Sequence, residues 1–386
     1  MRVWATWGAH DSNVSAVDTA GNGREPYLGA LKWLVEQADK RGMVVDVTLS
    51  RGNGAVSDNA LLPTQAAHLQ AVATLARELK PYRNLYLDVG NERNVRDPRF
   101  VSHEEIKALR DRIKEIDPDR LVTASHAGGE LSREELAAYL LKSQVDFLAP
   151  HRPRNAASPG QTAEKTQECF RWMREAGRVI PIHYQEPFRR DYSPWQPKAL
   201  DFLVDARQAR DGGAAGWCLH NGSPKRDQEG PRRSFDMRAE QGRLFDQLDT
   251  EERQVADQVS LVVNATTKTW LGLFDSRWHL NGQVTYPGAK AEGLLMNVRM
   301  VNSVFEDAND KTRPKGFDAD ANTNAFVAQI PDYVAHGIRA FTIFLQGCMP
   351  GYEGALNSAF TPEGALCPEY LKRVERVMRA ADDPGA

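Results

Sequence analysis

Residues 1–221 alternate between short apolar runs and longer amphipathic segments, and this alternation limits the folds open to the chain. Short, almost wholly apolar runs are typical of parallel strands that are covered on both faces. The predicted strands are, in chain order, Arg2–Trp7, Met43–Ser50, Leu85–Gly90, Leu121–Ser125, Val145–Pro150, Val179–Gln185 and Ala214–Leu219. Strands that alternate with helices in this way predict a parallel sheet with crossover helices.

Several of the intervening helices have readable ends. Ser102 with Glu105, and again Ser132 with Glu135, form the spacing of a capping box at a helix start. Gly42 follows an apolar-periodic segment and is placed to stop a helix. These signals predict helices between the predicted strands.

Seven βα units in residues 1–250, without a dinucleotide-binding glycine fingerprint or a P-loop, favour a (β/α)₈ TIM barrel over a doubly wound sheet. One strand is then missing. The strand Ile338–Leu345 in the C-terminal segment, residues 251–386, could supply it. We predict that it inserts between Ala214–Leu219 and Arg2–Trp7, which makes the barrel circularly permuted. The alternative is a truncated second barrel appended to the first.

The C-terminal segment breaks the βα rhythm of the first 250 residues. Its sequence predicts a hairpin that turns at Asn281-Gly282, a helix near Asn324–His336 and a final helix, Pro368–Ala381. The hairpin, the strand Ile338–Leu345 and the last helix would together complete the barrel.

Composition excludes several classes of protein. The 386 residues carry 49 Lys+Arg against 52 Asp+Glu, and this balance argues against a nucleic-acid partner. No apolar run approaches the roughly 18 residues of a membrane helix, so we expect no membrane partner. No apolar leader precedes the first strand, so a cytoplasmic location is the default expectation. The oligomeric state stays open.

Two carboxylates follow strands of the predicted sheet. The strand that begins at Leu85 runs into Asn91-Glu92, and a later strand runs into Glu186. Barrel active sites are built at these carboxyl ends, and a facing pair of carboxylates is what glycoside hydrolysis requires. Asn91 would donate to a sugar hydroxyl, and Trp217 would offer a ring for a pyranose to rest on.

This pattern resembles clan A of the glycoside hydrolases, the cellulase-like retaining β-glycosidases. The resemblance rests on Asn91-Glu92 after one strand, Glu186 three strands later and Trp217 on the next strand. It implies that Glu92 is the acid/base and Glu186 the nucleophile, with no cofactor. Arg2 matches the arginine of the clan that braces the nucleophile and the asparagine.

The resemblance covers about residues 1–250, and the C-terminal third resembles the N-terminal opening of a related barrel. The chain departs from the clan after the predicted strand Val145–Pro150. This strand would be the sixth of the barrel, because the resemblance makes Arg2–Trp7 the second. The clan often has a tyrosine there, near the nucleophile, whereas this chain has Pro150-His151-Arg152. Tyr184 is close in sequence but belongs to the next strand.

Four histidines, His126, His151, His183 and His220, lie at or near the ends of successive strands. With the two glutamates they could bind a divalent metal, as in a metal-dependent sugar isomerase or hydrolase. No His-x-His pair lies on an early strand, so we predict no metal and no cofactor. The predicted substrate-binding residues are Arg2, Asn91, His126, His151, Tyr184, Trp217 and His220.

Arginines crowd the same loops: Arg51, Arg93, Arg96, Arg152, Arg154, Arg189 and Arg190. They either attract an acidic glycan or form salt bridges with neighbouring carboxylates. The function that the sequence favours is retaining hydrolysis of a β-glycosidic bond in an oligo- or polysaccharide by two glutamates. Its rivals are the metal-dependent sugar enzyme and a carbohydrate-binding barrel without activity.

Overall fold

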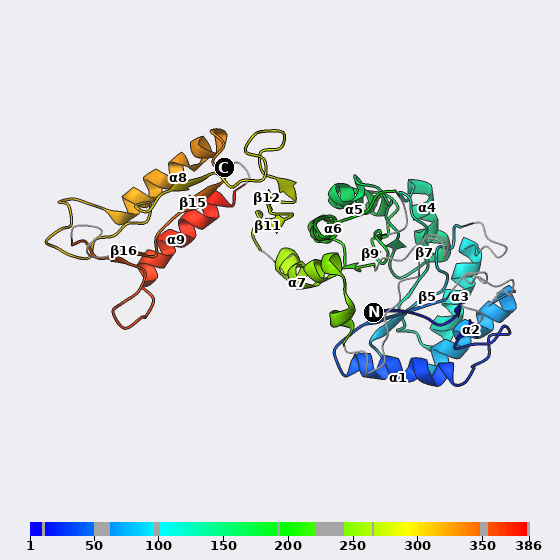
Figure 1. Cartoon of the computed structure of the whole chain (residues 1–386). Coiled ribbons are helices and arrows are strands. Elements are labelled where there is room, and N and C mark those ends of the chain that lie inside the picture. Colours follow the sequence, from blue (N-terminus) through cyan, green and yellow to red (C-terminus); the bar gives the residue numbers. More distant parts are fainter. Residues whose placement is uncertain are drawn as a thin grey trace. The chain divides into compact units, whose positions relative to one another are not determined.

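The computed structural model describes residues 1–9, 12–49, 62–95, 101–190, 194–220, 243–264, 266–347 and 354–383. The chain divides into two compact units, Met1–Val259 and Ser260–Ala386. Figure 1 shows the strands and helices of each. Among the described helices, none has the length and apolar character needed to cross a membrane.

The first unit is built from alternating strands and helices. Its strands are β1 (Arg2–Trp4), β2 (Gly8–Ala9), β3 (Ser12–Asn13), β4 (Val45–Thr48), β5 (Leu85–Asp88), β6 (Val122–Thr123), β7 (Ser125–His126), β8 (Ala149–Pro150), β9 (His183–Tyr184) and β10 (Gly216–Trp217). Its helices are α1 (Tyr27–Asp39), α2 (Gln65–Glu78), α3 (His103–Ile116), α4 (Arg133–Ala138), α5 (Ser158–Glu175), α6 (Ala199–Gly212) and α7 (Thr250–Asn264), the last of which runs into the second unit. A π-helical turn, Tyr139–Ser143, continues α4, and a short 3₁₀ helix, Leu244–Gln247, precedes α7.

Apart from the short antiparallel pair β2–β3, the strands of the first unit pair in parallel and in chain order. The ladders run from β1 to β4, β5 and β6, and from β7 to β8. A parallel bridge between Leu148 and Ile182 continues the sheet to β9, which pairs with β10. The predicted parallel α/β order is therefore present. Closure into an eight-stranded barrel stays a prediction, because the described ladders do not close the sheet.

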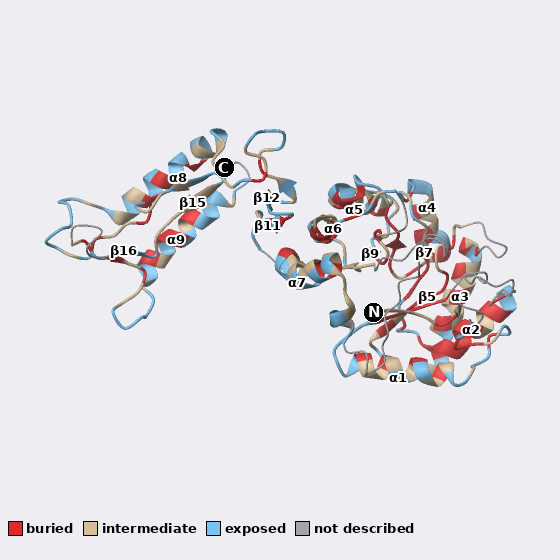
Figure 2. Ribbon diagram, viewed as in Figure 1, coloured by how far each residue is buried: buried red, intermediate tan, exposed pale blue. Residues whose placement is uncertain are grey.

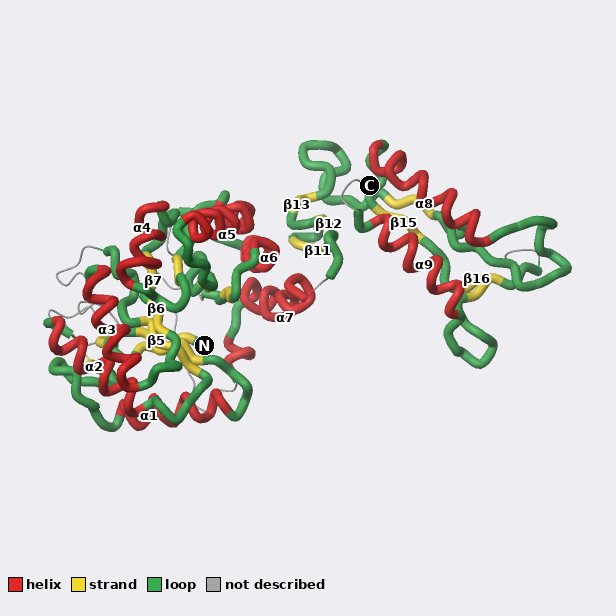
Figure 3. Tube along the Cα trace, turned by 180° about the vertical axis from the view of Figure 1, so that it is seen from behind, coloured by secondary structure: helices red, strands yellow, loops and turns green. Residues whose placement is uncertain are grey.

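The sheet nevertheless curls. The side chain of Arg2 on β1 reaches Glu186, which follows β9, so β1 and β9 face one another although several strands separate them in the pairing order. Helices pack outside the strands (Figure 3), and the buried residues concentrate between the two layers (Figure 2). Val45, Val47 and Leu87 are fully buried in that layer. Because side chains alternate along a strand, Asp46 and Asp88 point to the inner face, where they meet Arg2.

The caps predicted at two helix starts are confirmed. Ser102 accepts a hydrogen bond from the Glu105 amide at the start of α3, and Ser132 accepts one from the Glu135 amide at the start of α4. The predicted strands are longer than the observed ones, because only part of each forms ladder hydrogen bonds. Arg2–Trp7, for example, shortens to β1.

The second unit contains an antiparallel hairpin and a βαβ unit. Its elements are β11 (Leu271–Phe274), β12 (Arg277–Leu280), β13 (Gln283–Val284), β14 (Asn297–Arg299), α8 (Ala319–Ala335), β15 (Ala340–Thr342), β16 (Gln346–Gly347), β17 (Asn357–Ser358) and α9 (Pro368–Ala381). Asn281 and Gly282 both have positive φ, 52° and 81°, as a tight hairpin turn requires. The helices α8 and α9 lie side by side next to β15 (Figures 1 and 3), around a core that includes Phe326 and Tyr370.

The strand pairing of the second unit does not show the predicted permutation. Within the described residues β15, the centre of the predicted strand Ile338–Leu345, pairs in parallel with β14, and β1 pairs with β4. The physical reason is proximity along the chain. Helix α8 joins β14 to β15, so that pairing closes a shorter loop than an insertion into the first sheet would.

Candidate active site

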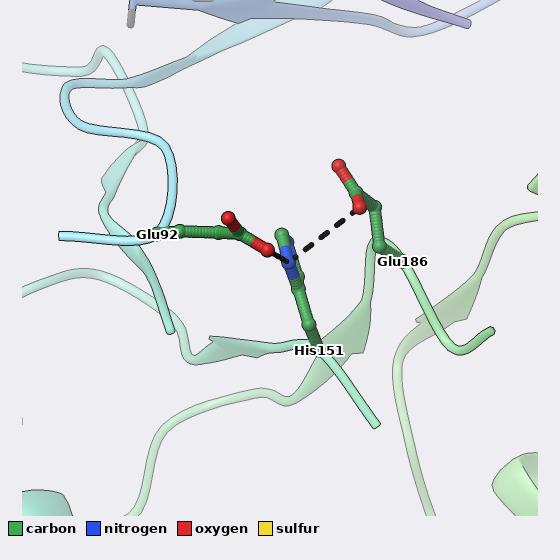
Figure 4. Close-up of side chains that lie close together, drawn as sticks. All are labelled: Glu92, His151 and Glu186. Carbon is green, nitrogen blue, oxygen red and sulfur yellow. Dashed lines mark hydrogen bonds and ion pairs between the residues drawn. The ribbon is translucent and has the colours of Figure 1, made fainter. Parts of the chain in front are cut away.

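The two glutamates come together where β5 and β9 end. One oxygen of Glu92, one oxygen of Glu186 and a ring nitrogen of His151 all lie within 4.8 Å of one another. Figure 4 shows the two carboxylates on either side of the His151 ring. The predicted facing of Glu92 and Glu186 is thus present in the structure.

His151 bridges the two carboxylates. Its Nδ1 lies 3.1 Å from Glu92 Oε1 and 3.7 Å from Glu186 Oε2. Its Nε2 lies 3.3 Å from the side-chain oxygen of Gln185, whose amide nitrogen donates to Asp46. Gln185 therefore presents an acceptor to His151, which places a ring proton on Nε2. Nδ1 then faces the two carboxylates, with Glu92 the nearer partner.

Glu186 is surrounded by positive or proton-bearing groups. Arg2 donates to Oε1, and Arg154 Nη2 donates to Oε2 at 3.3 Å. His220 Nδ1 lies 3.6 Å from Oε2. Burial alone would raise the pKa of Glu186, but His151, His220, Arg2 and Arg154 together hold that pKa well below its usual range. Glu186 is therefore ionised at neutral pH.

Arg154 bonds to Glu186 in a chain that lacks the tyrosine expected from the clan. It lies three residues after His151, beyond the predicted strand Val145–Pro150, and it donates a hydrogen bond to Glu186. A guanidinium provides a full positive charge where a tyrosine would provide a neutral donor. Sequence reasoning counted Arg154 only among the loop arginines.

Arg2 ties the floor of the site together. Nη2 donates to Asn91 Oδ1 at 2.8 Å and to Asp88 at 3.2 Å, and Nε donates to Thr48 Oγ1 at 2.9 Å. Sequence reasoning missed Asp46, Thr48 and Gln185. The signal for them was present, since polar residues inside an otherwise apolar strand must find partners on the inner face of the sheet.

Glu92 has an unusual backbone. Its φ is +48°, in the left-handed region that residues other than glycine seldom adopt. Its amide donates to Ser125 Oγ at 2.9 Å, and the Arg93 amide donates to the Ser125 carbonyl at 3.0 Å. β7 thus fixes the turn that carries the carboxylate.

Tyr184 and Trp217 do not lie where the prediction put them. Tyr184 is 2% exposed and shares a 2.7 Å hydrogen bond with Thr166 on α5. Trp217 is half-buried against the core, and its Nε1 donates to Asp205 on α6 at 2.6 Å. Both side chains leave their strands on the side that faces the helices, because side chains alternate along a strand. The substrate-binding role of the two residues stays a prediction, and these contacts do not support it.

His126 lies apart from the carboxylate pair. Its Nε2 is 3.3 Å from the Asn94 amide nitrogen and its Nδ1 is 3.4 Å from the Tyr139 hydroxyl. Burial lowers the pKa of His126 to about 4, so its ring is neutral at pH 7. His126 therefore contacts Asn94, two residues after Glu92, and not the two carboxylates.

Most of the described loop arginines form salt bridges. Arg152 makes two 2.8 Å hydrogen bonds to Glu130, Arg93 pairs with Glu135, and Arg190 pairs with Asp249. These contacts favour the salt-bridge interpretation for the three arginines. Arg154 likewise pairs with Glu186, and Arg51 and Arg96 lie outside the described residues.

The sequence matches no protein-family model and no curated protein. Among solved structures, the chain is similar to an endo-β-mannanase/endo-β-glucanase of Prevotella bryantii, with 14% identity, a TM-score of 0.46, and coverage of 68% of this chain and 41% of that one. It is similar to a glycoside hydrolase family 5 enzyme of P. bryantii B14, with 15% identity, a TM-score of 0.46, and coverage of 68% and 82%. A third is a glycoside hydrolase family 5 structure from Bacteroides vulgatus, with 16% identity, a TM-score of 0.38, and coverage of 50% and 43%. The chain spans less than half of the length of the first three structures that it matches. The solved structures that it is similar to are glycoside hydrolases.

Proposed function

We propose that the protein is a retaining glycoside hydrolase that cleaves β-glycosidic bonds with Glu186 as nucleophile and Glu92 as acid/base. One observation carries the proposal: oxygens of the two carboxylates lie within 4.8 Å of one another. Retaining enzymes hold their two carboxyl groups about 5–5.5 Å apart, whereas inverting enzymes need about 6.5–9.5 Å.

The electrostatics divide the roles of the two glutamates. Glu186, ionised and bonded to Arg2 and Arg154, is ready to attack an anomeric carbon. Glu92 lies 3.1 Å from His151 Nδ1, where a proton is available to it. Assigning the acid role to Glu92 follows from this difference in environment.

The reaction has two steps. In the first, the Glu186 carboxylate forms a bond to the anomeric carbon while Glu92 gives its proton to the leaving oxygen. In the second, Glu92 takes a proton from water, and the resulting hydroxide displaces Glu186 and regenerates both groups. The hydrogen bonds of His151 to Glu92 and to Gln185 hold the imidazole ring of His151 in one orientation through both steps.

The substrate is an oligo- or polysaccharide. The oxygen of the Asn91 side chain accepts from Arg2, which directs the Asn91 amide nitrogen away from Arg2 and toward a sugar hydroxyl. His220, 3.6 Å from Glu186 and partly exposed, is placed to contact the same sugar. No role for Trp217 or Tyr184 enters this proposal.

The test compares two variants on aryl β-glycosides with different leaving groups. Glu186→Gln should abolish turnover of both a phenyl and a dinitrophenyl glycoside. Glu92→Gln should lower kcat/KM for the phenyl glycoside by about 10²–10⁴-fold and spare the dinitrophenyl one, whose leaving group needs no proton. Glu130→Gln is the matched control. It changes a glutamate that is bonded to Arg152 and lies outside the carboxylate pair, so the variant should keep its activity.

Two outcomes would contradict the proposal. Full turnover by Glu186→Gln would show that Glu186 is not the nucleophile. NMR detection of the inverted anomer as first product would exclude a retaining mechanism. Saccharide binding by the parent protein without turnover of any β-glycoside would instead favour a carbohydrate-binding barrel.

A metal-dependent sugar enzyme is the second candidate, because Glu92, His151 and Glu186 offer three ligand atoms within 4.8 Å. Arg2 and Arg154 already neutralise Glu186, which disfavours a cation there. Metal analysis of purified protein, and activity before and after chelation, separate the candidates. Loss of activity with chelator and its return with one divalent ion would favour the metal enzyme.

A further inference from the structure

A second polar cluster lies behind the turn that carries Glu92. At its centre is Glu135, in the first turn of α4, which accepts a hydrogen bond from Arg93 Nη1. His103 Nε2 lies 3.2 Å from Glu135 Oε1 and 2.9 Å from Arg93 Nη1. Arg93 is 4% exposed and His103 is 9% exposed, whereas the Glu135 side chain is 28% exposed, so the pair is shielded from water mainly on the arginine side.

The pair of Arg93 and Glu135 carries the charges of this cluster. Burial lowers the pKa of His103 and, to about 4, that of His126, whose Nδ1 lies 3.7 Å from Glu135. Both rings are therefore neutral at pH 7. The negative charge of Glu135 is balanced by the guanidinium of Arg93, and a buried guanidinium depends strongly on such a partner.

Arg93 connects this pair to the carboxylate of Glu92. Its Nε donates to the Val101 carbonyl at 3.1 Å and its amide donates to the Ser125 carbonyl at 3.0 Å. Arg93 is thus anchored at the backbone and at the side chain. The residue directly before it is Glu92, which has the unfavourable φ of +48°. Such a conformation persists only where the surrounding structure holds it.

We propose that Glu135 is a positioning residue: through Arg93 it holds the Glu92 turn so that the carboxylate points at His151 and Glu186. This inference rests on the proposed function and adds to it a residue that lies outside the carboxylate cluster. Its consequence is specific. A displaced Glu92 no longer reaches the leaving oxygen, while Glu186 and its arginines stay in place. A misplacement of about 1 Å is enough for a loss on the order of 10²-fold.

The experiment measures kcat/KM, which reports the first step, for the phenyl and the dinitrophenyl β-glycoside. Glu135→Gln keeps the shape and removes the charge. We expect a loss of about 10–100-fold on the phenyl glycoside and less than about threefold on the dinitrophenyl one. Glu135→Asp retains the charge and should recover part of the loss. A role confined to stability would lower both values by the same factor, because only the fraction of folded enzyme changes.

The matched control is Asp117→Asn. Asp117 is a buried carboxylate bonded to the buried Arg120 at 3.0 Å, but it precedes β6 and so lies at the other end of the strands. It should lower stability toward urea and leave the ratio of the two kcat/KM values unchanged. An unchanged ratio in Glu135→Gln, at any level of activity, would overturn the proposal. If that variant does not fold, the ratio in Glu135→Asp decides the question. Failure of the proposed function is seen separately, as turnover by Glu186→Gln.

Discussion

The bond between Arg154 and Glu186 offers a quantitative test of the site. Arg154 Nη2 lies 3.3 Å from Glu186 Oε2, and each side chain is 13% exposed. At an effective dielectric constant of about 20, opposite charges at that distance attract by about 5 kcal/mol. Desolvation and the loss of side-chain freedom offset most of this. A hydrogen bond between charged groups therefore contributes about 1.5–3 kcal/mol net.

A double-mutant cycle measures this coupling. The parent protein, Arg154→Met, Glu186→Gln and the double variant are unfolded in urea, and the coupling is the part of the change in unfolding free energy that is not additive. We expect about 1.5–3 kcal/mol. A coupling below about 0.5 kcal/mol is typical of a solvated surface pair and would refute the buried geometry.

The same bond sets the pH dependence of the reaction. Glu186 acts in its ionised form, and Arg154 is one of the groups that hold its pKa low. Without Arg154 the pKa of Glu186 rises, so protonation begins at higher pH as the solution is acidified. A coupling of about 1.5–3 kcal/mol corresponds to an acid limb of kcat/KM displaced upward by about 1–2 pH units in Arg154→Met. An acid limb that does not move, or moves downward, would contradict the assignment of Glu186.

Three further predictions test the frame around the site. Trp217→Phe removes the donor to buried Asp205 and should lower the free energy of unfolding in urea by about 1–3 kcal/mol, with kcat/KM on aryl glycosides nearly unchanged; a large rise in KM would restore the platform role. Burial lowers the pKa of His183 to about 4, below its unfolded value, so its contribution is complete above about pH 6.5 and lost as the pH falls toward 4. The unfolding free energy of His183→Gln should therefore fall less than that of the parent over this window, and an equal fall would contradict the burial. Gly216→Ala would place a Cβ 2.1 Å from His183 Nδ1 and should lower the free energy of unfolding by at least about 1–3 kcal/mol. Gly160→Ala on α5 meets open space and should raise that free energy by up to about 1 kcal/mol. The order of the two urea midpoints checks the packing.

Local sequence signals predicted the elements better than their extents. Ser102 and Ser132 cap helices where their spacing predicted, because a cap depends on residues within one turn. The predicted strands were too long, because a ladder hydrogen bond needs a neighbour that the strand's own sequence does not specify. For the same reason β15 was assigned to the first sheet, whereas its pairing in the described chain is with β14.

The site itself divides in the same way. The order of strands and the position after each strand were sufficient to select Glu92 and Glu186, because carboxyl ends of parallel strands gather at one edge. The sequence could not decide which way a side chain leaves its strand when the register is uncertain by one residue. Such a slip exchanges the inner face for the helix-facing one, and in the structure Tyr184 and Trp217 bond to Thr166 on α5 and to Asp205 on α6.

What the sequence by itself determined is the alternation of strand and helix and the pair of strand-end glutamates, since both follow from local pattern and chain order. Only the tertiary structure decided that His151 lies between those glutamates, that Arg154 bonds to Glu186, and that Glu135 bonds to Arg93 next to Glu92. Each of these contacts joins residues from different strands or helices. Their geometry depends on the curl of the sheet and on burial, which are properties of the packed chain and not of any segment of it.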